Sequence, residues 1–468
     1  MSFTAKHSEK FSQVFDRSPY QSTDPITKIQ YVQKGNNVVF GRTIKDTDYG
    51  RLVYIGKVLE NTVGANYLSA DAWLDVTFPH VIYITGTRGS GKSFDLGVLI
   101  EGISQLSESS AIQNEMEPMC SIVIDTQSQF WTLAYQPNPA VPENKVQLEQ
   151  LGQWSINPNR LSNCRLFIPP VSKILTGTEE VFHIRPSQVR HEEWCAFIGE
   201  PVYSPQGHVL GQTIDHFINS SIQDYSIDDM LKFIQTSVAW ANVPDVSRNA
   251  VVYKLEGYRR TGLFSWQGLD IKELLKPGQC SVFMLRDLRS EDMALVTGII
   301  TRQVSVIMGE HHKKMKAGVF FNRKDTLDNL PNRVWTFIDE AHIIAPSDSM
   351  SAAKDALIDY VKRGRDAGLS LVMATQQPSA VEDRILSQVN ISFSHRLSFQ
   401  SDINAAINRI PTKLLRQLKY RGTDMADFGD MLRSLEAGEG FLGDNNTGRI
   451  ILLHIRPRMT SHGGYSPR

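Results

Sequence analysis

The pattern of apolar and polar positions first becomes regular near residue 81. Residues 81–85 form a compact run of β-branched and aromatic side chains, which predicts a buried strand. A glycine-rich turn follows. Apolar residues then recur at helical spacing, at Leu96, Leu99, Ile100, Ile103 and Leu106. The pattern therefore predicts a strand, a turn and a helix in this order.

The same alternation continues in two later parts of the chain. It predicts strands at 121–125, 280–285, 334–338, 369–375 and 391–397, and helices at 291–308 and 352–367. Gly368 is expected to cap the second of these helices. Strands that alternate with helices are typical of a parallel, doubly wound sheet, so the predicted fold class is α/β.

Other segments depart from this alternation. Residues 1–30 are polar and predict a loosely ordered arm, whereas 30–75 carry short β-like runs that predict a small β-barrel or meander. Residues 180–265 have helical periodicity, with amphipathic helices expected at 226–240 and 249–263. Residues 309–333 are rich in Lys, Arg and Asn and predict an exposed loop.

These textures predict the organisation of the 468-residue chain, which is long enough for two or three structural units. The predicted parts are an N-terminal arm (1–30), a small β-barrel-like domain (31–78), the first part of the core (79–178), a helical insertion (179–272), the second part of the core (273–443) and a C-terminal strand and tail (444–468).

Composition narrows the class of protein. Hydrophobic residues make up 41% and charged residues 21%, which is typical of a globular protein. The net charge of −1 gives no overall preference for nucleic acid, so such a contact requires a local basic surface. The four cysteines form no CxxC pair, and the sequence shows no secretory signal and no apolar run long enough to span a bilayer. We expect a cytoplasmic protein without a membrane segment.

A phosphate-binding motif follows the first strand. The residues Gly86, Thr87, Arg88, Gly89, Ser90, Gly91, Lys92 and Ser93 match G-x-x-x-x-G-K-[ST] in full. Glycines let the backbone N–H groups turn toward phosphate oxygens, the lysine reaches the β- and γ-phosphates, and the serine hydroxyl binds Mg²⁺. A glycine-rich turn can match by chance, but a preceding strand and a following helix favour a nucleotide site.

Two acids follow the apolar run 334–338. Asp339 at the tip of a buried strand is expected to hold Mg²⁺, and Glu340 to orient or deprotonate the attacking water. Acids also favour a helix N-terminus, which is the alternative explanation. His342 is either a hydrogen-bonded spacer or a group that senses the nucleotide. Together with the glycine loop, the acids predict an ATPase that uses ATP and Mg²⁺.

Polar residues near two further elements extend the candidate site. Gln376 follows the strand 369–375, where it contacts the γ-phosphate or water, or only forms a turn. Arg363 and Arg365 lie near the end of the helix 352–367, where a cation is favourable for the helix dipole. The alternative is an arginine finger that enters the site of a neighbouring subunit.

The order of these motifs resembles the HerA-like ATPases of the HerA/FtsK group of P-loop motors, from about residue 35 to the end. The resemblance rests on GTRGSGKS, SIVIDTQSQF, FIDEAH, GRDAGLSLVMATQQPS and the tail IRPRMTSHGG. It implies a RecA-like core, with Lys92 and Ser93 as Walker A residues and Asp339 and Glu340 as Walker B residues. It also implies that Arg365 acts in trans and that Gln376 is a polar sensor.

The sequence departs from the family pattern in two places. Asp125 is followed by Thr-Gln-Ser-Gln, where the family usually has a stretch like Asp-Pro-His-Gly-Glu, so an acid of the family is missing. The N-terminal β segment is also shorter than a full HerA barrel.

The resemblance implies a homohexamer that couples ATP hydrolysis to movement on double-stranded DNA. It also implies a partner, either a NurA-like nuclease in DNA-end processing or a nuclease or sirtuin-like effector in anti-phage defence. Lys313, Lys314, Lys316, Arg323 and Lys324 are either phosphate contacts or a solvated surface. Two alternatives remain: an ATP-gated scaffold that activates an effector enzyme with little translocation, and a conjugation or secretion ATPase of the VirB type.

Overall fold

The computed structural model describes most of the chain. The described residues are 37–41, 51–62, 65–114, 119–222, 224–237, 240, 243–321, 329–409, 418–420 and 423–463. The predicted arm at 1–30 lies outside these residues, as do Arg323 and Lys324.

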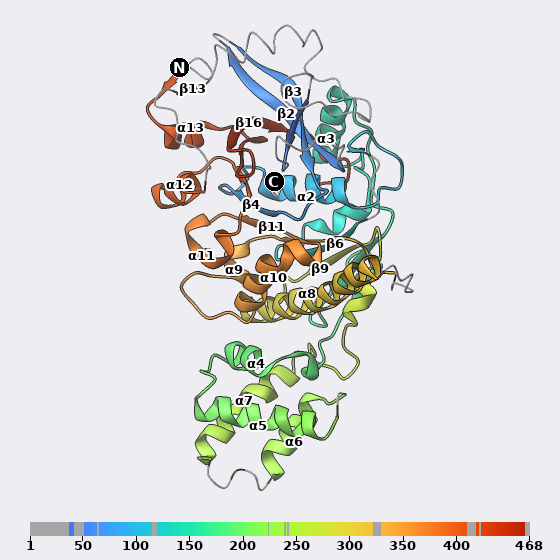
Figure 1. Ribbon diagram of the computed structural model, residues 1–468, viewed down its shortest axis with the longest axis vertical. Helices are drawn as coiled ribbons and strands as arrows, with labels where there is room; N and C mark the ends of the chain where they lie inside the picture. The colour runs from blue at the N-terminus through green and yellow to red at the C-terminus, as the bar shows by residue number, and fades with distance from the viewer. Residues whose placement is uncertain are drawn as a thin grey trace.

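The described residues form a 14-stranded sheet, most of which is parallel (Figure 1). The parallel part runs in the order β12 (Ile391–Ser394), β4 (Val81–Thr85), β11 (Leu369–Thr375), β10 (Val334–Ile338), β6 (Cys120–Asp125), β9 (Cys280–Met284), β7 (Cys164–Ile168) and β8 (Glu179–Val181). The α/β class and its parallel sheet are therefore confirmed. The predicted strands at 81–85, 334–338 and 369–375 have these bounds, whereas β12 ends three residues before the expected 397.

Helices cover both faces of the parallel part. The helices are α2 (Lys92–Ile103), α3 (Pro142–Gln153), α8 (Ser290–Phe320), α9 (Ala341–Ile344), α10 (Lys354–Ala367) and α11 (Asp383–Leu386). Side chains alternate along β4: Tyr83 packs in the cluster that contains α8 and α10, whereas Ile82 and Ile84 pack in the cluster that contains α2. Every residue of β11 is buried, as expected for a central strand covered on both faces.

Further strands extend this sheet at the β12 edge, and all of their pairings except the last are antiparallel. They follow in the order β15 (Glu439–Asp444), β16 (Arg449–Ile455), β2 (Leu52–Thr62), β3 (Ala65–Asp75) and β1 (Asn37–Phe40), and β5 (Gln113–Asn114) pairs with β2. β13 (Leu418–Tyr420) and β14 (Thr423–Met425) form a separate pair near α12 (Gln400–Ile407) and α13 (Phe428–Ser434). The described N-terminal strands of the segment 31–78, expected to be barrel-like, are therefore hydrogen-bonded to the main sheet through β16.

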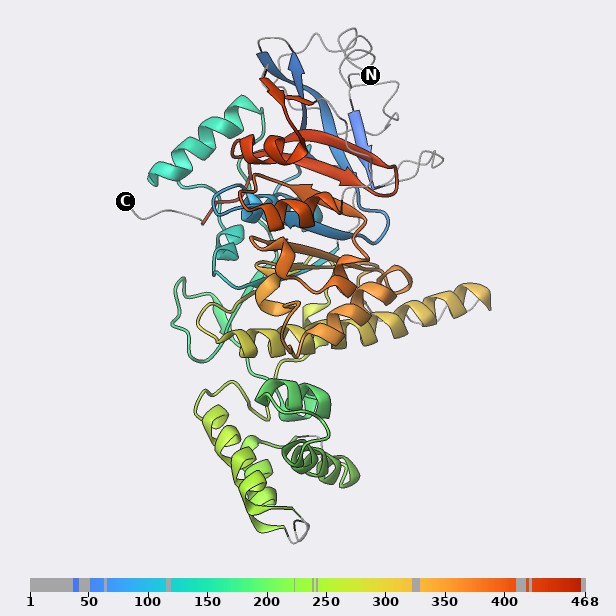
Figure 2. The ribbon, with the colours of Figure 1, turned by 90° about the vertical axis from the view of Figure 1, so that its left-hand side faces the viewer.

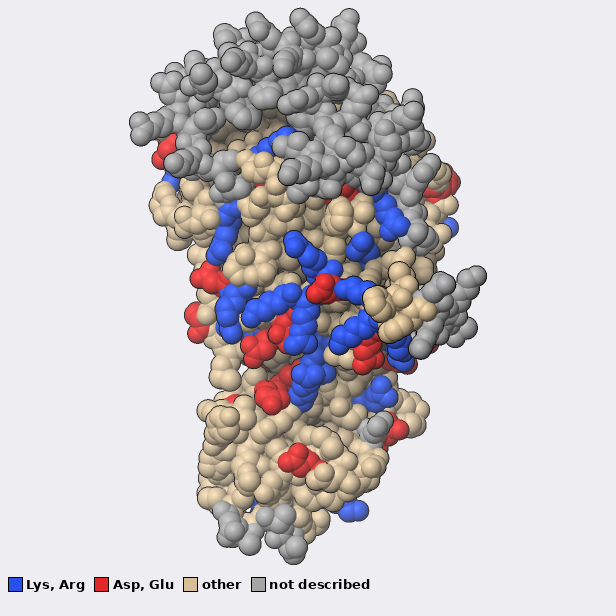
Figure 3. Space-filling model, viewed as in Figure 1, with Lys and Arg blue, Asp and Glu red and all other residues tan. Residues whose placement is uncertain are grey.

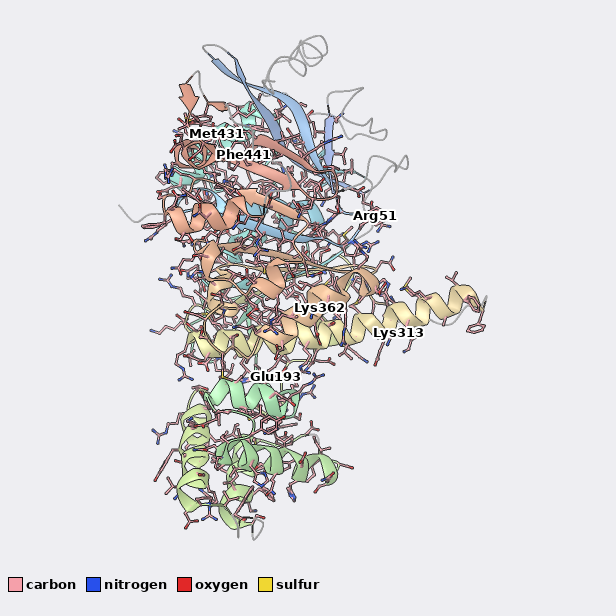
Figure 4. The ribbon with its side chains drawn as sticks, turned by 60° about the vertical axis from the view of Figure 1, so that its left-hand side comes forward. Arg51, Glu193, Lys313, Lys362, Met431 and Phe441 are labelled. Atoms are coloured by element: carbon pink, nitrogen blue, oxygen red, sulfur yellow. The ribbon has the colours of Figure 1, made fainter. Side chains whose placement is uncertain are left out.

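Four helices form a unit that extends from the main body (Figure 1). They are α4 (His191–Ile198), α5 (Pro205–Asn219), α6 (Ile227–Thr236) and α7 (Asp245–Arg259). The helix expected at 226–240 forms but ends at Thr236, and the helix expected at 249–263 lies four residues earlier, at 245–259. Glu193 on α4 faces the body (Figure 4), where it forms a two-point ion pair of 2.6 and 2.9 Å with Arg302 on α8. This pair joins the helical unit to the body, because both side chains are mostly buried.

The prediction of a loop at 309–333 is wrong for residues 309–320, which are helical. α8 continues without interruption to Phe320, and its C-terminal half extends beyond the body (Figure 2). Lys is a good helix former, and a helix that leaves the core needs no apolar periodicity. The polar composition of this segment therefore indicated exposure correctly but not the absence of helix.

Candidate functional site

The phosphate-binding loop joins β4 to the first turn of α2. Gly89 and Gly91 have φ angles of 74° and 121°, which side chains with a Cβ rarely adopt. Gly86 has no space for a Cβ, which would lie 2.3 Å from the Ser90 hydroxyl. Thr87 and Arg88 belong to the loop, and Lys92 and Ser93 are the first two residues of α2. The backbone thus has the form that presents N–H groups and a helix N-terminus to an anion.

The parallel sheet brings the loop and the acids to one edge. β11 lies between β4 and β10, with Thr375 paired with Thr85 and Met373 paired with Ile338. The carboxyl ends of the three strands therefore lie side by side. Asp339 and Glu340 follow β10, and Gln376 follows β11. Ligand sites of α/β sheets lie at this edge.

Lys92 connects the loop to the acids. Its ammonium group donates a 2.9 Å hydrogen bond to the Thr87 carbonyl, and its side chain is buried. Burial lowers the pKa of Lys92, and the negative charges of Glu340 and Asp339 oppose this decrease. Lysine and both acids therefore act on one another electrostatically, although almost 250 residues separate them in sequence.

Asp339 is a buried acid with an incomplete set of hydrogen bonds. Its Oδ1 accepts a 3.1 Å bond from the Glu340 N–H, whereas the buried Oδ2 has no hydrogen-bond partner among the residues that the structure describes. Burial raises the pKa of Asp339 to about 8, and the negative charges of Glu340 and Asp125 add to the increase. A buried carboxylate oxygen without a partner is suited to an oxygen-preferring cation such as Mg²⁺, so the residues fit the expected metal.

The raised pKa of Asp339 predicts a pH-dependent stability without metal. A carboxyl with a higher pKa in the folded state contributes stability that is fully present below pH 3.8 and is lost as the pH rises through about 8. Asp339→Asn should therefore raise the free energy of unfolding by about 1–3 kcal/mol at pH 8 without Mg²⁺, and by less at pH 5. Denaturant unfolding at both pH values measures this, and an unchanged difference would contradict it.

Glu340 has a strained backbone conformation, and both of its carboxylate oxygens accept hydrogen bonds. It adopts a left-handed conformation with φ 51°, which is uncommon for a residue other than glycine and clusters at functional sites. The backbone N–H of Gln376 donates to Glu340 Oε2 at 3.2 Å, and the Gln376 side chain donates to Glu340 Oε1. Gln376 thus contacts the acid that is expected to direct water.

His342 also lies next to Glu340. Its Nδ1 lies 3.0 Å from the Thr375 hydroxyl and 3.4 Å from Glu340 Oε2. Burial lowers the pKa of His342, so the ring is neutral near pH 7. The structure therefore places His342 in the site as a hydrogen-bonded neighbour of the acid.

The two arginines of α10 are not brought to this site. Gly368 caps α10 with φ 68°, as expected, and leads into the opposite end of β11. Arg363 lies 3.5 Å from Asp359, and both Arg363 and Arg365 are exposed. A seven-residue strand is roughly 20 Å long, so these arginines are too far from the glycine loop of their own chain.

Asp125 has a structural role at the end of β6. Its oxygens accept bonds from the N–H groups of Gln127 at 3.2 Å and Phe130 at 2.7 Å. Burial raises the pKa of Asp125 to about 6, and these backbone bonds oppose the increase. Asp125, the acid that this chain has at the start of the divergent Asp-Thr-Gln-Ser-Gln stretch, therefore stabilises the turn that follows β6.

Sequence reasoning missed the contacts of the C-terminal tail. Arg456 and Arg458 are fully buried against α2, where Glu101 accepts a 2.9 Å bond from Arg456. Glu101 also accepts bonds from Met459 and Thr460 of the tail. The signal available in the sequence was the pair of arginines in IRPR, directly after the apolar run of β16. Arginines that become buried require acidic or carbonyl partners, which points to contacts of this tail with another element. The tail thus fixes the helix that carries Lys92.

The fold and this arrangement of loop and acids define a P-loop NTPase, which is a class of enzymes. A sequence profile described as "Helicase HerA, central domain" matches residues 53–304, more than half of the chain. The chain therefore belongs to the HerA family within the HerA/FtsK group of ATPases.

Two curated relatives are also named HerA. The chain is 24% identical over 145 residues to "DNA double-strand break repair helicase HerA" of Sulfurisphaera tokodaii, a match that covers 31% of this chain and 27% of that protein. It is 21% identical over 201 residues to the protein of the same name from Sulfolobus acidocaldarius, covering 42% and 36%. The matches thus span between a quarter and two fifths of the relatives' lengths.

A solved structure shares the fold. VirB4 of Thermoanaerobacter pseudethanolicus superposes with a TM-score of 0.51 at 14% identity, covering 88% of this chain and 98% of that one. Within the described ranges, every helix is too short or too polar to cross a membrane.

Proposed function

We propose that this chain is a Mg²⁺-dependent ATPase that moves on double-stranded DNA as a homohexamer. The supporting observation is that Lys92 of the glycine loop and the acids Asp339 and Glu340 meet at one edge of the sheet. Membership of the HerA family, whose curated members named above are DNA repair helicases, supports DNA as the track. The effector is a NurA-like nuclease or a sirtuin-like enzyme, in DNA-end processing or anti-phage defence.

Each residue of the site has its own role in ATP hydrolysis. The loop 86–93 binds the phosphates, and Lys92 neutralises negative charge on them. Ser93 and Asp339 would hold Mg²⁺, which neutralises the charge that develops on the phosphate oxygens. Glu340 orients the attacking water and accepts its proton. Gln376 donates one hydrogen bond to each oxygen of Glu340, and each oxygen keeps a second lone pair that can accept a bond from the attacking water.

Basic side chains offer a surface for the DNA backbone. Lys and Arg form a band across the middle of one face, over α8 and α10 and interspersed with acids (Figure 3). Lys313 lies on the projecting half of α8 (Figure 4), beside Lys314 and Lys316. Lys316 is 3.6 Å from Asp366, and both are exposed, so this ion pair is weak and leaves Lys316 available to a phosphate.

The helical unit favours a second function, an ATP-gated scaffold. Tyr203, Val246 and Tyr253 are 99%, 81% and 72% exposed on this unit. Large exposed aromatic and apolar side chains are suited to a protein partner. In this alternative, the ring assembles and activates an effector enzyme and translocates little.

ATP turnover with and without linear duplex DNA distinguishes these functions. A motor should hydrolyse ATP several-fold faster with DNA, whereas a scaffold should respond to its partner protein.

Lys92→Ala should lower ATP turnover by about 10²-fold or more, both with and without DNA, because the phosphates lose their charged donor. Near-normal turnover in this variant would remove Lys92 from the site.

A further inference from the structure

A histidine outside every motif lies directly beneath the phosphate-binding loop. His395 follows β12, and its N–H donates to the Thr85 carbonyl at 2.9 Å. The next carbonyl, that of Arg396, accepts a 2.8 Å bond from the N–H of Thr87. The pairing of β4 with β12 therefore continues into the loop, and the fully buried side chain of His395 lies with its Cβ next to Gly86.

Both ring nitrogens of His395 face oxygen atoms. Nε2 lies 2.7 Å from Asp95 Oδ2, on the first turn of α2, and Nδ1 lies 2.7 Å from the Glu439 carbonyl on β15. A carbonyl and a carboxylate only accept hydrogen bonds, so both ring nitrogens donate. Burial is the largest single influence and lowers the pKa of His395, but the charge of Asp95 and the hydrogen bonds with Asp95 and Glu439 together outweigh burial. The pKa of His395 is therefore raised, which agrees with this geometry.

The glycines of the loop also lie close to the side chain of His395. A Cβ on Gly86 would lie 2.8 Å from the His395 Cβ, and a Cβ on Gly91 would lie 3.5 Å from the ring. A Cβ on Gly440 of β15 would lie 3.2 Å from the same ring. Interiors of this density transmit small displacements, so the position of the ring sets the position of the loop.

We propose that His395 is a positioning residue, which joins the first turn of α2 to β15 and holds the loop in the shape that binds phosphate. The proposal rests on nucleotide binding by this loop, as in the proposed function. His395 is buried and acts through Asp95 and the loop glycines, not by touching the nucleotide. Its loss should therefore weaken nucleotide binding more than it slows the chemical step.

The test compares two substitutions of His395 with a matched control. His395→Ala should raise the Kd of a fluorescent ADP analogue, and the KM for ATP, about tenfold, with a smaller change in kcat. His395→Gln keeps one hydrogen-bond donor, so its Kd for the ADP analogue should lie between those of the wild type and of His395→Ala. His80 is the control, because it is also buried and bonded at both ring nitrogens, to Asp75 and Asn390, but lies at the opposite end of β4. His80→Gln should lower Tm without changing the Kd.

A ¹⁵N spectrum of the histidines gives an independent reading. Two N–H signals from His395 in the nucleotide-free chain, absent in His395→Gln, support the arrangement with Asp95 and Glu439. If both His395 variants bind ADP like the wild type and differ only in Tm, His395 is structural and the proposal is overturned. If the wild type itself binds no ADP, the proposed function fails, and the inference fails with it. The His80 variant separates these results from general loss of folding.

Discussion

Glu340→Gln is expected to bind ATP normally and to hydrolyse it about 10²–10⁴-fold more slowly than the wild type. An amide has the shape of the carboxylate but cannot accept the proton of the attacking water. The Gln376 side chain donates to Glu340 Oε1, and the amide oxygen of the variant can accept the same bond. The variant keeps this bond and loses only the 3.2 Å bond from the Gln376 backbone N–H to Oε2. Most of the local conformation should therefore persist, and the main loss is one of chemistry. Single-turnover hydrolysis and equilibrium ATP binding, measured on the same preparation, separate these effects.

Glu382 provides the control for this substitution. It is also a buried acid after β11, but it lies 3.3 Å from Lys354 and 2.9 Å from Arg384. Glu382→Gln removes a carboxylate charge outside the site and should leave turnover per folded molecule close to that of the wild type. Undiminished phosphate release by Glu340→Gln would assign the water-directing role to another residue.

Arg365→Ala is expected to fold and bind ATP but to lose about 10³-fold or more in turnover, as arginine fingers do. The helix α10 ends at the far end of β11 from the loop, so Arg365 can reach only the site of another subunit. A deficiency in trans can be complemented by mixing. Arg365→Ala supplies an intact loop, and Lys92→Ala supplies an intact arginine. Mixed oligomers of these two inactive variants should therefore regain activity.

Two further variants define the outcome. Lys362 is an exposed cation on the same helix (Figure 4), and Lys362→Ala should leave turnover unchanged. If Arg365→Ala is active, or if mixing restores nothing, Arg365 is not the residue that acts in trans. Arg363, two residues earlier, then becomes the candidate, and the same mixing experiment with Arg363→Ala decides it.

The strand-loop-helix unit was predictable because its determinants are local. An apolar run, glycines that allow positive φ, and a following helical period all lie within about 25 residues, and β4, the loop and α2 follow them. The central strands β10 and β11 were equally clear, since continuous apolar runs are typical of strands covered on both faces. The projecting half of α8 was missed because it has no core contact to impose a period.

The sequence by itself determined the glycine loop, the buried strands and the acids that follow one of them, because each depends on neighbours along the chain. Only the tertiary structure decided which side chains contact the acids and the glycine loop. The order β4, β11, β10 places Gln376 on Glu340, and the pairing of β12 with β4 places His395 under the loop, 300 residues from Asp95. These contacts depend on strand order and register, which arise from packing the whole sheet.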